Sequence, residues 1–327
     1  MRPRFLVTGE SPPVEALVVD SAVAGGALTL SHWHDSPPIA PDIADDTSAG
    51  IVLRALRDPA RLAPFTLVCN DHVDADGLIA IAAACRPEVA LPHAAMLIAA
   101  AEAGDFTAWA DADALALMVT LHRLIQQETA GGAGWEQRCY DQMVDSFPAL
   151  IAAAASPDVA TTAVIDRFRA ARRRIETRDG VAIDRLGDLA EIRWRRRTVH
   201  AWDQFLAVDA DDDLPLHALG GLLPDTCFQL RCEDTGAGIV YALDAPRHSW
   251  ARTVRRPIVR WPDLSRARLR LEELDRGRCR WVLRPEAQRA GFVCQLASVD
   301  AAGDPSPSGL APATVAAAIR EALRLRR

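Results

Sequence analysis

One short stretch, "VCNDHVDADGLIAIAAA" at residues 68–84, concentrates groups that can do chemistry. His72, Asp74 and Asp76 alternate along it, between a short apolar run and a glycine that opens a long apolar run. On an extended segment this spacing places the three side chains on one face and points Asp71 away. Imidazole and carboxylate ligands suit manganese, magnesium, iron or zinc better than copper(I). We predict a divalent metal site here, and a solvated turn is the alternative.

A second candidate is the H-x-H pair His32 and His34, at the end of a strand predicted at 26–33. Two imidazoles with this spacing can bind one metal ion. If this strand and the one predicted at 65–71 are neighbours in a sheet, both loops open on one crevice, and the histidines can add ligands to the first stretch. Asp46 is a further candidate ligand, although an acidic residue just before a helix commonly caps it.

Regular elements must position these side chains. Strand-like runs at 14–20, 26–33 and 65–71 alternate with helix-like runs at 47–62 and 77–88. This alternation predicts an α/β fold with a mostly parallel sheet and flanking helices. In such sheets, ligands bind beyond the carboxyl ends of the strands. Four alanine-rich helical runs follow as a helical connector, at 92–103, 111–130, 135–154 and 158–177, with breaks at Pro148 and Pro157.

The pattern changes near residue 178. Alternating apolar residues around glycines predict hairpins at 177–194 and 226–244. Further strands are predicted at 279–285 and 291–300, and a closing helix at 311–327. We therefore predict two domains, an α/β metal-binding domain with its helical connector at 1–178 and a smaller basic α+β domain at 179–327.

Charge is divided unevenly along the chain. Residues 247–327 contain 17 arginines and 8 acidic residues, which leaves 20 arginines and 36 acidic residues for the rest. An acidic first part suits cation binding, and a basic last part suits an anionic ligand. Four arginines near tryptophans could grip a substrate phosphate or form the exposed face of a strand. They are Arg247, Arg252, Arg255 and Arg256.

Composition excludes several classes of chemistry. All 37 basic residues are arginine, which excludes Schiff-base lysines, a P-loop lysine and a carbamylated lysine as a metal bridge. The seven cysteines form no C-x-x-C pair and argue against a disulfide framework or a zinc knuckle. No apolar stretch is long enough for a membrane span, and the first residues do not resemble a signal peptide. We expect a cytoplasmic protein without a membrane partner.

The H-x-D-x-D-G arrangement at residues 72–77 resembles the first motif of the DHH phosphoesterase superfamily, which includes single-strand exonucleases, exopolyphosphatases and hydrolases of cyclic dinucleotides or oligoribonucleotides. The resemblance implies that His72 and Asp74 hold one manganese ion and that Asp76 reaches a second. It also implies a smaller basic domain that grips the substrate. The chain lacks the Asp-His-His triplet of that superfamily and its glycine-rich C-terminal signature. The stretch also resembles one in an uncharacterised bacterial family.

From these patterns and the resemblance we expect a metal-dependent hydrolase with His72, Asp74 and Asp76 as catalytic metal ligands. The expected activity is that of a phosphoesterase, with a metal-bound hydroxide attacking an anionic small molecule or short nucleotide rather than long nucleic acid. The missing triplet leaves open a non-catalytic binding or regulatory protein on a DHH-like scaffold. A metalloenzyme of another type, amidohydrolase-like or redox, also stays open because these ligands do not fix the reaction.

Overall fold

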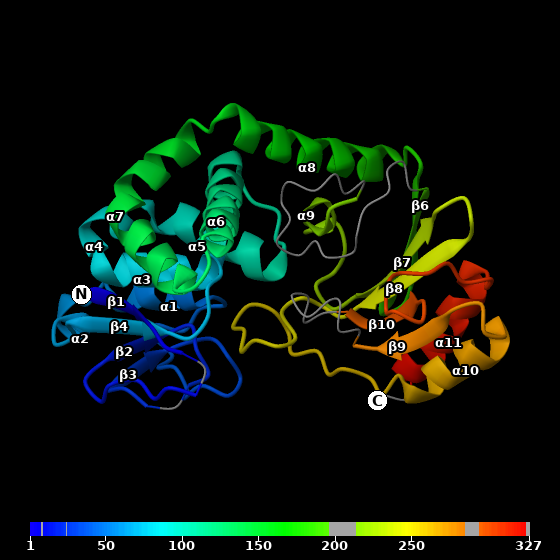
Figure 1. Cartoon of the computed structure of the whole chain (residues 1–327), viewed down its shortest axis with the longest axis horizontal. Coiled ribbons are helices and arrows are strands. Elements are labelled where there is room, and N and C mark those ends of the chain that lie inside the picture. Colours follow the sequence, from blue (N-terminus) through cyan, green and yellow to red (C-terminus); the bar gives the residue numbers. More distant parts are fainter. Residues whose placement is uncertain (8, 24, 196–213, 285–293, 325–327) are drawn as a thin grey trace. The chain divides into compact units, whose positions relative to one another are not determined.

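The computed structural model describes the chain apart from residues 8, 24, 196–213, 285–293 and 325–327 (Figure 1). It divides into two compact units. The first contains Met1–Asp166 and Trp250–Pro257, and the second contains Arg167–Ser249 and Ile258–Arg327. The chain thus changes unit inside helix α8 (Val159–Thr177), earlier than the boundary predicted at 178, because Ala171 and Ile175 of that helix pack into the core of the second unit.

The first unit contains a wholly parallel sheet, so the predicted fold class is confirmed. Its strands are β1 (Arg2–Phe5), β2 (Leu17–Val19), β3 (Leu28–Leu30) and β4 (Leu67–Asn70), in the order β1-β4-β2-β3. Strand β2 lies between β3 and β4, so the strands that precede the two histidine motifs are not direct neighbours. Because all four strands run the same way, the loops after β2, β3 and β4 nevertheless leave from one edge of the sheet.

Seven helices of the first unit lie between or beside these strands (Figure 1). They are α1 (Ser48–Ala55), α2 (Pro59–Leu62), α3 (Ala75–Cys85), α4 (Pro87–Ala90), α5 (Ala94–Phe106), α6 (Ala112–Ala130) and α7 (Trp135–Ala155), with a 3-10 turn at Leu91–His93. Helix α3 is buried from Ala75 to Ala84. It is apolar on nearly all sides, as expected of a helix that is packed all round, and its alanines let α1, α5 and α7 approach it closely.

Pro148 lies inside α7, so the break predicted there is wrong, whereas Pro157 does fall between α7 and α8. A proline has no N–H and cannot donate to the carbonyl four residues earlier, which here is that of Val144. The structure supplies a partial substitute, because Nη1 of Arg86 lies 3.5 Å from the oxygen of Val144. Helix α7 therefore continues through the proline.

We expect the substitution Pro148→Ala to stabilise the protein. A proline in a helix interior costs about 3 kcal/mol relative to alanine, and part of this is offset by the greater freedom of the unfolded chain. The free energy of unfolding should therefore rise by about 1–3 kcal/mol in a urea titration. A decrease would show that packing around the proline ring outweighs the recovered hydrogen bond.

The second unit is built on a six-stranded mixed sheet in the order β5-β6-β7-β8-β10-β9. The strands are β5 (Val181–Leu186), β6 (Leu189–Arg195), β7 (Phe228–Asp234), β8 (Ile239–Asp244), β9 (Arg280–Leu283) and β10 (Cys294–Val299). Pairs β5–β6 and β7–β8 are the two hairpins predicted from the sequence. Helices α10 (Ser265–Asp275) and α11 (Pro312–Arg324) share a core with the sheet, and α9 (Leu216–Leu219) joins the core that contains the end of α8.

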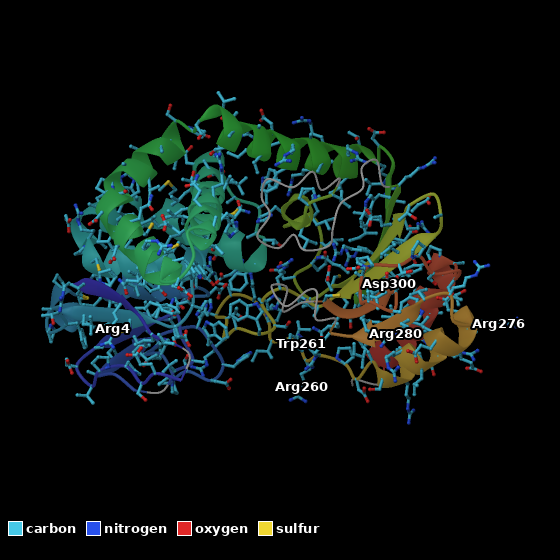
Figure 2. All side chains as sticks on the ribbon, in the orientation of Figure 1. Arg4, Arg260, Trp261, Arg276, Arg280 and Asp300 are labelled. Atoms are coloured by element: carbon cyan, nitrogen blue, oxygen red, sulfur yellow. The ribbon has the colours of Figure 1, made fainter. Side chains whose placement is uncertain are left out.

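The arginine-rich part of the second unit contains a helix that the sequence patterns did not predict. Residues 265–275 form α10, where a strand face was one of the interpretations. Asp275 is buried at its end and accepts hydrogen bonds from Cys279, Trp281 and the backbone of Gly309. The exposed arginines nearby include Arg276, whose side chain lies on the outside of this unit in Figure 2.

No single helix in the described part of the chain is both long enough and apolar enough to cross a membrane. Two bent helix pairs reach the required length and composition together: Ala75–Cys85 with Pro87–Phe106, and Trp135–Ala155 with Val159–Thr177. Helix α3, which belongs to the first of these pairs, is buried from Ala75 to Ala84.

Candidate metal centre

The carboxyl edge of the parallel sheet gathers a cluster of acidic and imidazole side chains. Asp20 follows β2, His32 comes two residues after β3, and His72 comes two residues after β4. Helix α3 adds Asp74 and Asp76 at its start, and helix α5 adds an aspartate in its last turn. This is the edge at which parallel sheets bind ligands.

Two groups of possible metal ligands share one residue. Asp20, His32 and Asp76 form the inner group, and Asp20, His72 and Asp74 form the outer group; in each group one ligand atom per residue lies within 4.8 Å of the others. Asp20 Oδ1 lies 3.5 Å from His32 Nε2, and Asp20 Oδ2 lies 3.2 Å from His72 Nε2. Each oxygen of one carboxylate therefore faces a different imidazole.

The backbone at Asp20 is in the left-handed region, with φ of 49°. Aspartate and asparagine tolerate this conformation better than most residues, yet it is uncommon and concentrates at functional sites. Ser48 and Trp33 both donate hydrogen bonds to Asp20 Oδ1, at 2.9 and 3.2 Å. The shared carboxylate is thus held in place by its surroundings.

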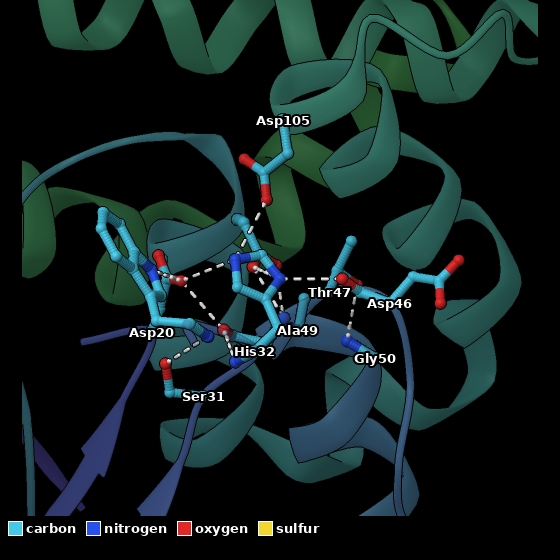
Figure 3. Close-up of polar contacts among 12 residues, drawn as sticks. Asp20, Ser31, His32, Asp46, Thr47, Ala49, Gly50 and Asp105 are labelled. Atoms are coloured by element: carbon cyan, nitrogen blue, oxygen red, sulfur yellow. Dashed lines mark hydrogen bonds and ion pairs between the residues drawn. The ribbon is translucent and has the colours of Figure 1, made fainter. Parts of the chain in front are cut away.

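In the inner group, the tautomer of His32 is fixed by its surroundings. Its Nδ1 lies 2.8 Å from the carbonyl oxygen of Asp46 and must donate to it, since a carbonyl only accepts (Figure 3). Burial lowers the pKa of His32, so Nε2 carries a lone pair. That lone pair faces Asp20 and, at 3.7 Å, Asp105 Oδ2. A metal cation, or a proton on Asp105, would satisfy this lone pair.

Asp76 anchors the inner group to helix α1. Its two oxygens accept hydrogen bonds from the backbone N–H groups of Ser48 and Ala49, both at 2.7 Å. The positive end of the helix dipole favours an ionised carboxylate there. Burial, together with the charges of Asp20 and Asp74, nevertheless raises the pKa of Asp76 well above its usual range. A bound cation would remove this conflict.

The outer group is the more accessible of the two. Nδ1 of His72 donates to Asp71 Oδ1 at 3.0 Å, and Nε2 lies 3.2 Å from Asp20 Oδ2 and 3.3 Å from Asp74 Oδ2. Burial opposes a charge on this imidazole, but the charges of Asp74 and Asp20 raise the pKa of His72 well above its usual value. The His72 side chain is 31% exposed, whereas that of His32 is 0% exposed.

The start of α3 positions the outer group. Asp74 is the N-cap of the helix, and its Oδ1 accepts from the N–H of Gly77 at 2.8 Å. A Cβ atom at Gly77 would lie 2.4 Å from Asn70 Nδ2 and 2.9 Å from Asp20 Oδ2. The glycine therefore lets helix α3 approach the carboxylates. Behind it, Tyr140 on α7 donates to the carbonyl of His72 at 2.6 Å.

The donor set fits a divalent cation. Several buried atoms of the cluster make no hydrogen bond of normal geometry among the described residues, although the first and third of them lie 3.2 Å apart: Asp20 Oδ2, His32 Nε2, His72 Nε2, Asn70 Nδ2 and Asp105 Oδ2. Burial and the charges of Asp76 and Asp74 raise the pKa of Asp105 well above its usual range. Burial also acts against an ionised Asp20, but contacts with His72 and His32 lower its pKa. Imidazole with carboxylate suits manganese, magnesium, iron or zinc.

Of the candidate ligands from the sequence, the structure brings together His32, His72, Asp74 and Asp76. His34 is exposed, and only His32 of the H-x-H pair belongs to the cluster. The expected common face of His72, Asp74 and Asp76 ends at Asp74, because helix α3 begins there and the period of two stops. Asp71 contacts His72 instead of pointing away.

Asp46 is buried but belongs to neither group of possible ligands. Its carboxylate accepts hydrogen bonds from the N–H groups of Val254 and Arg255, at 2.6 and 2.9 Å. Burial alone would raise the pKa of Asp46, but these N–H groups and two arginines lower it. The cap of α1 is Thr47, which accepts from Gly50 at 3.1 Å. Asp46 therefore does not cap α1, and its carboxylate is taken up by donors from residues 254–256.

The four candidate substrate-binding arginines all have acidic or carbonyl neighbours. The guanidinium of Arg252 donates to three backbone carbonyls in the loop 34–37. Arg255 and Arg256 form ion pairs with Asp46 and Glu102. Arg247 belongs to the second unit, where burial lowers its pKa to about 10 despite the nearby charge of Asp244.

Three acidic residues of the cluster were missed as candidates. The sequence does carry a signal for Asp20, because this acidic residue ends the strand predicted at 14–20, but no other candidate ligand lies near it in the chain. Asp71 was expected to point away. Asp105 lies in the last turn of α5, a position typical of surface residues, yet its side chain is only 4% exposed and faces His32 (Figure 3).

The comparisons with known proteins give one match. No curated protein and no solved structure matches the chain. One family model matches residues 1–323, which is nearly the whole chain. The chain therefore belongs to the family described as "family of unknown function (DUF6687)".

Proposed function

We propose that this protein is a hydrolase that depends on divalent metal ions and acts as a phosphoesterase on a small anionic substrate or short nucleotide. The observation that carries the proposal is the pair of ligand groups joined through Asp20, each with an imidazole nitrogen directed at carboxylates. The H-x-D-x-D-G stretch at 72–77, which resembles the first motif of the DHH phosphoesterases, supports the same chemistry. Manganese is the ion we expect.

Two bound divalent ions would activate a water molecule and neutralise the developing charge on a phosphoryl group. The chain itself orients the ligands. Asp71 and the carbonyl of Asp46 each accept from an imidazole Nδ1, which leaves Nε2 of His72 and His32 directed into the cluster. The outer group, with Asp74 about one-third exposed, is the side that a substrate can reach.

Two substitutions of Asp74 test the proposal, because this residue is both a candidate ligand and the cap of α3. Serine keeps a cap and removes the carboxylate, whereas alanine removes both. We expect both variants to lose the outer ion and the hydrolysis of bis(p-nitrophenyl) phosphate with manganese. Only Asp74→Ala should also lose about 0.5–2 kcal/mol of stability.

Elemental analysis after growth with manganese, together with the hydrolysis assay, provides the measurement. Asp42→Asn is the control, because Asp42 is a surface residue paired with Arg61 and should change neither result. Metal bound without any hydrolysis would favour a binding or regulatory protein. Wild-type protein without bound metal after supplemented growth would contradict the proposal.

A further inference from the structure

Residues Trp250–Pro257, here called the clamp segment, belong to the first unit although the chain on both sides belongs to the second. The segment lies against the loop that carries His32. Ala251 forms an antiparallel bridge with Trp33, and the N–H of Arg252 donates to the carbonyl of His32 at 2.6 Å. Residues more than 200 positions apart are thus joined directly at the candidate metal centre.

The side chain of Arg252 extends this attachment. Its Nη1 donates to the carbonyl of Pro37 at 3.0 Å, and its Nη2 donates to the carbonyls of His34 and Ser36 at 2.7 and 2.9 Å. Hydrogen bonds from a charged donor are among the stronger ones in proteins. Together with the hydrogen bonds of Ser36, this side chain holds the loop after His32.

A second attachment passes through Asp46. Its carboxylate is held by the backbone of Val254 and Arg255 and by an ion pair with Arg256, whose guanidinium also lies 4.6 Å from the centre of the Phe106 ring. The carbonyl of the same Asp46 accepts from His32 Nδ1. The clamp segment thus holds Asp46 in place, and the carbonyl of Asp46 in turn fixes the tautomer of His32.

Trp250 makes the third contact. Its ring centre lies 5.0 Å from that of His32 in an edge-to-face arrangement, and 5.1 and 6.1 Å from those of Trp33 and Phe106. Such aromatic pairs restrict ring orientation beyond simple burial. The His32 ring is thereby confined on its faces as well as at Nδ1.

We propose that the clamp segment positions His32 and so sets the affinity of the inner group for a divalent ion, while the outer group depends on it much less. This inference rests on the proposed function, since it concerns the same metal centre. The hydrogen bonds that orient His72 of the outer group involve Asp71 and Tyr140, which lie outside the clamp segment, and the His72 ring reaches that segment only indirectly, through Trp33 at 5.3 Å. Substitution of a residue that orients a ligating histidine typically weakens metal affinity by about 10–100-fold.

The test removes Arg256, one of the two arginines that pair with Asp46, and measures each group alone. In a His72→Gln background only the inner group keeps its three ligands, and in a His32→Gln background only the outer group does. Manganese affinity is measured in each background from the free-ion signal in electron paramagnetic resonance. We expect Arg256→Met to weaken binding about 10–100-fold in the first background and to leave the second unchanged.

Two further variants separate positioning from general damage. Arg256→Lys retains the charge beside Asp46 and should restore most of the affinity, whereas Arg61→Met removes an arginine–aspartate pair elsewhere in the unit and should change neither group. Arg252→Met removes the side-chain attachment to the loop 34–37 and should weaken the inner group more than the outer group. Circular dichroism identifies any variant that fails to fold.

The outcomes are distinct. Unchanged affinity in the His72→Gln background, or equal losses in both backgrounds, would overturn the role of the clamp segment and leave the metal-dependent function in place. If wild-type protein and both backgrounds bind no manganese, the proposed function itself is wrong. A loss confined to the inner group, with recovery by Arg256→Lys, supports the inference.

Discussion

Asp20→Asn is expected to remove metal binding from both groups at once. Asp20 is the only residue common to the two groups, and its two oxygens face different histidines. The amide carries no charge and offers only one oxygen, so neither group keeps a charged ligand at this position. His32→Gln and His72→Gln should each remove one ion, whereas Asp20→Asn should remove two and abolish hydrolysis.

The fold should survive this change. Asparagine tolerates the left-handed conformation at least as well as aspartate, so the backbone at φ of 49° is not strained further. Asp20→Ala would add that strain and is the less suitable variant. Elemental analysis, circular dichroism and the hydrolysis assay together provide the measurement. An asparagine variant that retains two equivalents of metal would show that Asp20 is not the bridge.

Gly77→Ala is expected to damage both the fold and the outer group. Alanine is favoured over glycine in a helix by about 1 kcal/mol, so a solvent-exposed glycine in α3 would gain stability from this change. Here the new Cβ would lie 2.4 Å from Asn70 Nδ2, 2.9 Å from Asp20 Oδ2 and 3.2 Å from Asp74 Oδ1. To relieve these close contacts, helix α3 or the neighbouring side chains must move.

We expect a net loss of about 1–3 kcal/mol in the free energy of unfolding, as is typical of overpacking, together with loss of the outer ion. Urea titration and metal analysis measure the two effects. Adding Asn70→Ala opens space at the closest contact, so the double variant should recover part of the stability. A Gly77→Ala protein that is more stable than wild type and binds metal normally would refute the proposed role of this glycine.

Local sequence patterns were sufficient to predict much of the scaffold. Short apolar runs that end in polar residues indicated β2, β3 and β4, and alanine-rich periodic runs indicated helices α5 to α8. These signals are local, because a strand or helix end is defined by neighbouring residues. Strand β1 was not predicted, since its four residues alternate two arginines with proline and phenylalanine.

The candidate ligands were only partly predictable. His72, Asp74 and Asp76 stand close together in the chain, and their spacing was a strong signal. Asp105 gave no such sequence signal, because its approach to His32 depends on how α5 packs against the sheet and not on its neighbours in sequence. The arginines of the clamp segment were recognised as unusual, but their acidic partners lie about 150 to 210 residues away.

Local patterns in the chain are enough to predict the fold class, the hairpins of the second unit and a set of imidazole and carboxylate groups at strand ends. Which of these groups meet depends on the three-dimensional arrangement of the strands and loops. The strand order brings three loops to one edge, so Asp20 comes to lie between His32 and His72. The fold also places Trp250–Pro257 in the first unit, where the Asp46 carboxylate forms an ion pair with Arg256. These pairings depend on distances between residues far apart in the chain, which local propensity does not encode.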